Sequence, residues 1–224
     1  MNGHPVTLGI FLAALGELIL TVAGSNLSFP RLSPDGLRLA YARGDEVMVV
    51  VVATHQNETV IPASYGALKS LQWTDDRHLA ADFARNRIVA DVVTKRRTSA
   101  KPPKPAGAKP IEFCDTTLRA TTDRDSLTLW RTSGTSTLPL ATIYPADNGT
   151  IEVLRTTPRE AIFLLRIAPR SRADVTNHLM SYDGVRLRAY GVDGLDDAGF
   201  SSDGHRIVIS VWENAQRRLL VYAR

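Results

Sequence analysis

The sequence predicts an all-β fold in which short strands recur as repeated units. The turn Ser-Pro-Asp-Gly at 33–36 recurs as Ser-Ser-Asp-Gly at 201–204, each between apolar segments, and weaker copies lie near positions 74 and 157. Short β-branched runs alternate with Gly, Pro, Ser, Thr and Asp, as in strands joined by frequent turns. Repeats of about 42 residues made of short strands are typical of β-propeller blades. We therefore expect a β-propeller of four-stranded blades, with about five blades in a closed ring or a partial one.

The first expected blade contains the clearest turn. Residues 29–32 and 37–42 read as strands on either side of it, because Pro34 has the φ that a second turn residue requires and Gly36 tolerates positive φ. The apolar segment 46–53 does not alternate with polar residues. Such a segment indicates a strand covered on both faces, as between neighbouring blades.

The remaining blades are expected in chain order, with turns of varying quality. The second turn has lost its Pro and Gly, the third copy is the least distinct, and the fifth blade is short of its outer strand. We expect the propeller domain over 25–224, with blades near 27–65, 68–94, 111–146, 151–192 and 198–224.

Residues 1–24 have two interpretations, and the sequence leaves both open. The apolar segment 6–24, with small residues at 21–23, resembles a secretory signal peptide, although no Lys or Arg precedes it and Glu17 interrupts it. Alternatively, residues 18–23 supply the outer strand of the fifth blade and close the ring, which removes two exposed edges. The first interpretation predicts export to the periplasm and the second is compatible with a cytoplasmic protein. Neither predicts an integral membrane segment in the mature chain.

One basic segment, residues 95–110, accounts for the formal net charge of +4. It contains six basic residues and no acid, and its four prolines predict an extended, mobile loop between the second and third blades. Such a loop could contact an acidic partner, a phosphate backbone or an anionic membrane. A solvated insertion is the favoured interpretation, because no aromatic residues accompany the charges, and nucleic acid is not an expected partner. The basic residues are Lys95, Arg96, Arg97, Lys101, Lys104 and Lys109.

Two segments resemble the repeat of TolB-type propellers: Phe-Pro-Arg-Leu-Ser-Pro-Asp-Gly-Leu-Arg-Leu-Ala-Tyr at 29–41 and Phe-Ser-Ser-Asp-Gly-His-Arg-Ile-Val-Ile at 200–209. The first half also resembles the N-terminal propeller of prolyl oligopeptidase family serine peptidases, through Trp-Thr-Asp-Asp-Arg at 73–77. In that family the propeller gates access to a separate hydrolase domain. Residues 199–203 do not complete a Gly-x-Ser-x-Gly elbow, so the resemblance does not imply peptidase activity here.

The other chemically active residues fit structural roles, and we expect no metal and no cofactor. The carboxylates Asp193, Asp196, Asp197 and Asp203 are close in sequence, but their spacing matches no EF-hand loop and glycines among them indicate turns. Cys114 is the only cysteine, which excludes a cysteine metal cluster within one chain. We expect the tryptophans to anchor the packing of blades. They are Trp73, Trp130 and Trp212.

These observations predict a scaffold rather than an enzyme. The expected function is non-catalytic binding of a protein or peptide by a TolB-like propeller. The alternative is an accessory or truncated propeller of a prolyl oligopeptidase-like serine peptidase that lacks its hydrolase domain. We expect the repeated turn residues to be structural and the six basic residues above to be a possible partner contact. The turn residues are Ser33, Pro34, Asp35, Gly36, Ser201, Ser202, Asp203 and Gly204.

Overall fold

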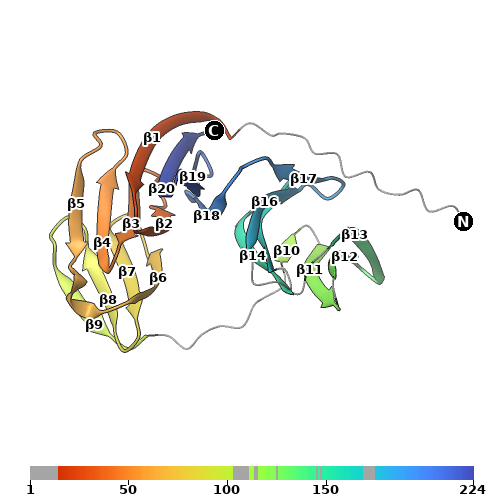
Figure 1. The fold of residues 1–224 in the computed structure, drawn as a ribbon, viewed down its shortest axis with the longest axis horizontal. Helices are drawn as coiled ribbons and strands as arrows, with labels where there is room; N and C mark the ends of the chain where they lie inside the picture. The colour runs from red at the N-terminus through yellow and green to blue at the C-terminus, as the bar shows by residue number, and fades with distance from the viewer. Residues whose placement is uncertain are drawn as a thin grey trace, which may run out of the picture. The chain divides into compact units, whose positions relative to one another are not determined.

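The computed structural model describes residues 15–102, 111–113, 116–124, 126–144, 146, 148–168 and 175–224, and these residues form an all-β structure (Figure 1). The strands make five sheets of four strands each. The predicted all-β class is therefore confirmed, and the five sheets agree with the expected number of blades. In the part of the chain that the structure describes, no helix is long and apolar enough to cross a membrane.

The chain divides into two compact units. The three-sheet unit comprises residues 15–102 and 196–224, and the two-sheet unit comprises the described residues between 111 and 195. In the three-sheet unit the sheets are β2-β3-β4-β5, β6-β7-β8-β9 and β1-β20-β19-β18. Its strands are β1 (Glu17–Gly24), β2 (Leu27–Leu32), β3 (Arg38–Arg43), β4 (Glu46–Val51), β5 (Asn57–Ile61), β6 (Leu68–Trp73), β7 (His78–Phe83), β8 (Arg87–Asp91), β9 (Arg97–Ala100), β18 (Leu195–Phe200), β19 (Arg206–Glu213) and β20 (Gln216–Ala223), with one short 3-10 helix, η1 (Ala63–Tyr65).

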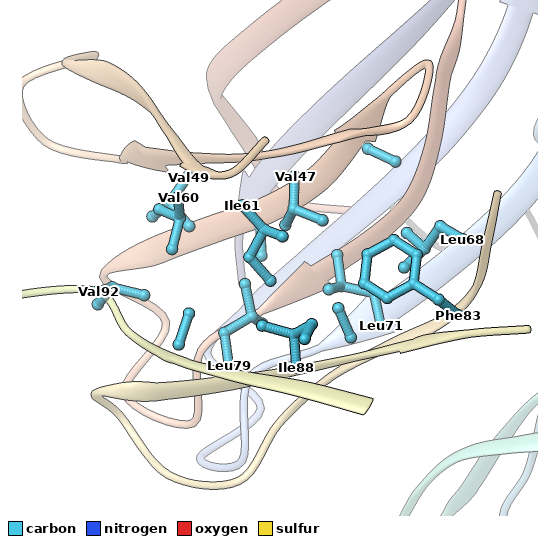
Figure 2. Close-up of a cluster of buried hydrophobic side chains, with 14 residues drawn as sticks. Val47, Val49, Val60, Ile61, Leu68, Leu71, Leu79, Phe83, Ile88 and Val92 are labelled. Atoms are coloured by element: carbon cyan, nitrogen blue, oxygen red, sulfur yellow. The ribbon is translucent and has the colours of Figure 1, made fainter. Parts of the chain in front are cut away.

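The sheet β2–β5 lies in the middle of the three-sheet unit. Its first strand, β2, contacts β19 and β20 of one neighbouring sheet and β6 of the other. The two faces of β4 explain why its residues 47–51 include no polar side chain. Val47 and Val49 pack in a cluster with the β6–β9 sheet, whereas Met48 and Val50 pack in a second cluster with β19 and β20. The non-alternating apolar segment thus corresponds to a strand that is buried between two neighbouring sheets. Figure 2 shows the first of these clusters.

Residues 17–24 form β1, which is the fourth strand of the sheet that contains β18, β19 and β20. The strand β1 runs antiparallel to β20, with Glu17 opposite Ala223 and Gly24 opposite Arg217, and the two strands lie side by side in Figure 1. Leu20 is buried in the cluster shared with the β2–β5 sheet, whereas Glu17 is exposed. The charge that interrupts the apolar segment therefore lies on the solvent side of a strand. The rest of the proposed signal peptide, residues 1–14, lies outside the described residues.

The two-sheet unit contains the sheets β10-β11-β12-β13 and β14-β15-β16-β17. One apolar cluster joins them, with Leu118, Leu127 and Leu129 from the first sheet and Phe163 and Leu165 from the second. Strands β11 and β12 contact β14, the first strand of the next sheet. The strands are β10 (Ile111–Phe113), β11 (Thr116–Asp123), β12 (Ser126–Ser133), β13 (Ser136–Ile143), β14 (Asn148–Thr156), β15 (Ala161–Ala168), β16 (Thr176–Tyr182) and β17 (Leu187–Tyr190).

The structure corrects the expected boundary of the basic loop. We expected an extended loop over 95–110 and a second blade that ended at residue 94. Residues 97–100 instead form β9, which pairs antiparallel with β8 and completes the second sheet. The strand was missed because all four of its side chains are exposed, so it has no apolar pattern. Residues 103–110 lie outside the described part of the chain.

Candidate functional site

The turn at 33–36 is held by one buried serine. The Ser33 hydroxyl donates to Asp35 Oδ1 at 2.5 Å and accepts the backbone N–H of Arg38 at 3.0 Å. Asp35 Oδ1 also accepts the N–H of Leu37 at 2.9 Å. Gly36 has φ of 69°, in the left-handed region that glycine adopts without strain. The tetrad is thus a closed hydrogen-bonded turn in which each residue has a distinct structural role.

The turn at 201–204 repeats the same hydrogen bonds. Ser201, also buried, donates to Asp203 Oδ1 at 2.6 Å and accepts the N–H of Arg206 at 3.0 Å, while Asp203 Oδ1 accepts the N–H of His205 at 2.9 Å. Because the Ser201 hydroxyl bonds the ionised carboxylate, the pKa of Asp203 lies below its usual value. The sequence repeat is therefore a repeat of hydrogen-bond geometry.

These turns also bond to each other across neighbouring sheets. The N–H of Ser202 donates to the carbonyl of Pro34 at 2.9 Å, and the Arg206 guanidinium donates to the carbonyl of Gly36. The turn after β18 is thereby fixed directly to the turn after β2. Both turns lie at the same end of their sheets, where the first strand of each sheet turns into the second.

The turn after β6 continues this arrangement. Asp76 Oδ1 accepts the N–H of Asp35 at 2.8 Å, and its backbone carbonyl accepts from the Arg38 guanidinium at 3.2 Å. The neighbouring Asp75 accepts the N–H groups of Arg77 and His78 at 2.8 and 2.7 Å, and the first of these bonds contributes most to lowering the pKa of Asp75. Three turns from three sheets therefore form one connected set of hydrogen bonds, and the carboxylates at 75–76 serve as turn residues.

The acidic residues near the start of β18 make separate contacts. Asp197 pairs with Arg31 of β2 at 2.9 Å, and Asp196 pairs with Arg217 of β20 at 3.3 Å. Asp203 belongs to the turn described above. No group of three or more His, Cys, Asp or Glu side chains that could hold a metal ion occurs among the residues that the structure describes. The contacts join β18 to β2 and β20 instead.

The basic residues are divided between two environments. Lys95 pairs with Glu58, and Arg97 Nε donates to the carbonyl of Val60 at 2.7 Å, so both bind β5 of the neighbouring sheet. Arg96 and Lys101 are exposed on either side of β9. The last two of the six predicted contact residues, Lys104 and Lys109, fall outside the described residues. The structure therefore gives two of the described cations a structural contact and leaves two on the surface.

The three tryptophans differ in environment. Trp73 packs against the cluster of Figure 2 and donates its indole N–H to the carbonyl of Arg31 at 2.9 Å, as expected of an anchor between sheets. Trp130 donates to Thr121 Oγ1 at 2.7 Å within its own sheet. Trp212 is 50% exposed near the end of β19 and was wrongly expected to anchor packing.

Arg217 holds the exposed Trp212 in position. Arg217 lies in β20 directly opposite Trp212, and its guanidinium is 5.4 Å from the centre of the indole ring. The same guanidinium donates to the carbonyl of Leu27 and pairs with Asp196, so its own position is fixed from two further strands. No local sequence signal locates this pair, because Arg217 reaches Trp212 only through the pairing of β19 with β20.

No family model matches the chain, and neither does any of the curated proteins compared. Solved structures that resemble it include the β-propeller domain of the Trilobed protease from Pyrococcus furiosus, 18% identical over 84% of this chain and 64% of that chain, with a TM-score of 0.31. TolB from Acinetobacter baumannii is 14% identical over 87% of this chain and 54% of that chain, with a TM-score of 0.37. The acylaminoacyl peptidase from Pyrococcus horikoshii is 16% identical over 84% and 36%, with a TM-score of 0.31.

These structures come from the two groups that the sequence resembles, TolB and peptidase propellers. The chain spans less than two thirds of the length of each of the three. The described residues form five four-stranded sheets, and hydrogen-bonded turns join three of them.

Proposed function

We propose that this chain is a non-catalytic scaffold of the β-propeller type that binds a protein or peptide. The observation that supports it best is the exposed Trp212, which Arg217 holds in place from the opposite strand. Tryptophan and arginine are the residues most enriched among those that dominate protein–protein binding energies. A tryptophan fixed in advance also loses little conformational entropy when a partner binds.

The rigidity of the strand that carries Trp212 also supports the proposal. Residues 207–211 of β19 are buried, and the turn before the strand is bonded to the neighbouring sheet. Trp212 lies at the other end of the same strand, about 20 Å from that turn at roughly 3.3 Å per residue. One end of the sheet is therefore fixed by hydrogen bonds while the opposite end presents an aromatic surface, as in a scaffold that positions a binding residue.

Selection from a random peptide library on the immobilised chain tests this function. Peptides that bind the wild type should bind Trp212→Ala about 30-fold more weakly, which corresponds to about 2 kcal/mol for a dominant contact residue. The matched control is Trp130→Ala, which removes a tryptophan of similar size from the other unit and should leave affinity unchanged. Equal loss in both variants, or no selectable peptide, would contradict the proposal.

A serine-hydrolase activity probe distinguishes this scaffold from an independent enzyme. The purified chain should remain unlabelled, and specific labelling of one serine would refute a non-catalytic role. An accessory propeller of a prolyl oligopeptidase-like peptidase should also remain unlabelled, but it should co-purify with a separately encoded hydrolase from native extract. Probe labelling and co-purification together distinguish a binding scaffold, an independent enzyme and an accessory propeller.

We further propose that β1 remains in the mature protein and that its pairing with β20 joins the first and last strands of a propeller. Cleavage within 21–23 would remove most of β1 and leave β20 with an unpaired edge. The N-terminal sequence of the protein isolated from its native cells tests this. A mature chain that begins after residue 23 would refute retention and would favour export to the periplasm.

A further inference from the structure

The strand β9 has one paired edge and one open edge. It pairs with β8, from Arg97 opposite Ala90 to Ala100 opposite Arg87, and no other strand in the described parts of the chain pairs with its far side. Its four side chains are all exposed. A backbone edge of this kind can accept a further strand from another molecule.

The hydrogen bonds of the adjoining turn show which backbone groups point outward. The N–H of Asp91 donates to the carbonyl of Arg96 at 2.9 Å, so these two residues form a hydrogen-bonded pair. Bonded and non-bonded pairs alternate along antiparallel strands. Thr98 therefore points its backbone groups toward β8, whereas Arg97 and Ser99 point theirs toward the open edge. These two residues offer two N–H donors and two carbonyl acceptors to an added strand.

This edge is held rigidly before any partner binds. The guanidinium of Arg97 is bonded to the carbonyl of Val60, and Lys95 pairs with Glu58, so β9 is fastened to β5 at its start. A fixed edge avoids part of the entropic cost of ordering a strand upon binding. At the other end the strand stops at Ala100, so a partner can pair over only a short stretch.

The charges beside β9 select the kind of partner. Arg96 and Lys101 flank the strand, both exposed, and neither forms an ion pair with another described residue. Two copies of this edge would bring like charges together, which disfavours pairing between copies of the chain. An extended segment with acidic residues near its ends would instead place carboxylates beside both cations.

We propose that the open edge of β9 binds an acidic, extended peptide segment by strand addition, with Arg97 and Ser99 supplying the backbone bonds and Arg96 and Lys101 the charge. This inference rests on the proposed function, which is protein or peptide binding. It adds the edge of β9 as a second binding surface in addition to Trp212 and names an acidic peptide as its partner. The edge of β13 is a poorer acceptor, because Pro139 lies within that strand.

Fluorescence polarisation with a short labelled peptide of alternating Glu and Thr tests the proposal on the full chain. We expect micromolar affinity that weakens as salt is added, and at least about tenfold weaker binding to Ser99→Pro, which removes one outward N–H. The matched control Ser99→Ala keeps that N–H and should bind like the wild type. A peptide with a central proline, or with Lys in place of Glu, should not bind. Equal binding of the proline peptide would overturn strand addition, and absence of binding by the acidic peptide would overturn the proposal altogether.

Hydrogen exchange on the wild-type protein provides a second measurement that does not depend on the folding of a variant. The amides of Arg97 and Ser99 should exchange rapidly in the free protein and slow when the acidic peptide is added, while Thr98 should be protected in both states. Unchanged exchange at Arg97 and Ser99 would refute the assigned edge. Trp212→Ala should bind the acidic peptide normally, so a failure at β9 is distinguishable from a failure at the Trp212 surface.

Discussion

Replacing Ser33 by alanine removes the centre of the first repeated turn. The lost hydroxyl donates to Asp35 Oδ1 and accepts the N–H of Arg38, and the serine is fully buried. In the variant the amide of Arg38 has lost its acceptor inside the protein, at a cost of about 1–3 kcal/mol. Asp35 loses a charge-assisted bond as well, but it keeps the N–H of Leu37 and its side chain is 27% exposed, so this second loss is partly recovered from water.

The expected destabilisation by Ser33→Ala is therefore about 2–3 kcal/mol. Urea unfolding followed by far-ultraviolet circular dichroism measures it as a lower midpoint. Ser201→Ala should cost a similar amount because its bonds are the same. The double variant should depart from additivity by about 0.5 kcal/mol or more, since the two turns are bonded to each other.

Ser210→Ala is the matched control for both substitutions. Ser210 is also fully buried, but its hydroxyl has no hydrogen-bond partner among the described residues. Removing an unsatisfied hydroxyl from an apolar environment should be neutral or stabilising. If Ser33→Ala destabilised the protein no more than Ser210→Ala, the assignment of the turn network as a source of stability would be wrong.

Three further predictions concern other parts of the three-sheet unit. Hydrogen bonds from Arg87 hold the pKa of Asp82 below its usual value, so the pair stabilises the fold at pH values above the unfolded-state pKa of about 4. This stabilisation is lost as the pH falls through the lowered pKa of the folded state. Asp82→Asn should therefore lower the free energy of unfolding by about 2 kcal/mol at neutral pH and by little in strong acid, as measured by urea unfolding at each pH. Gly36→Ala should lower the free energy of unfolding by about 2 kcal/mol or more, and Gly44→Ala by about 1 kcal/mol. Both glycines have positive φ, but only at position 36 would a Cβ meet neighbouring side chains, at 3.1 Å. Equal melting temperatures of the two variants would contradict this prediction. A chain without Glu17–Gly24 should self-associate in size-exclusion chromatography with light scattering, since β20 becomes an open edge, and a monomer would count against that role of β1.

Much of the strand content could be predicted from local sequence. The turns at 33–36 and 201–204 were recognisable because each residue of the tetrad has a local reason to be there, and the apolar run of β4 reported burial on both faces. The strand β9 escaped prediction because an edge strand with polar, exposed side chains resembles a loop. Residues 97–100 are a strand because they pair with β8, and the local sequence pattern carries no information about that pairing.

The contacts between sheets could not be predicted from the repeat alone. Spacing indicated that Asp35 and Asp76 occupy equivalent places in neighbouring blades, but not that one donates to the other. Trp212 shows the same limit, because an indole at the end of an apolar strand is compatible with either a core or a surface position. Arg217, which decides its orientation, is separated from it by a turn whose geometry the side-chain pattern does not reveal.

Burial of both faces of β4 has a consequence for how this strand is aligned with β3. In a strand with one solvent-exposed face, a shift of the register by one residue would expose apolar side chains to solvent. The free-energy cost of that exposure fixes the register. Residues 47–51 of β4 are apolar on both faces, so a slip would mainly exchange the two sets of neighbours. The alignment must then come from the hairpin, where Gly44 adopts φ of 61° and Arg43 lies opposite Glu46. Lengthening that hairpin by one residue should therefore be far more damaging than replacing one aliphatic side chain of β4 by another.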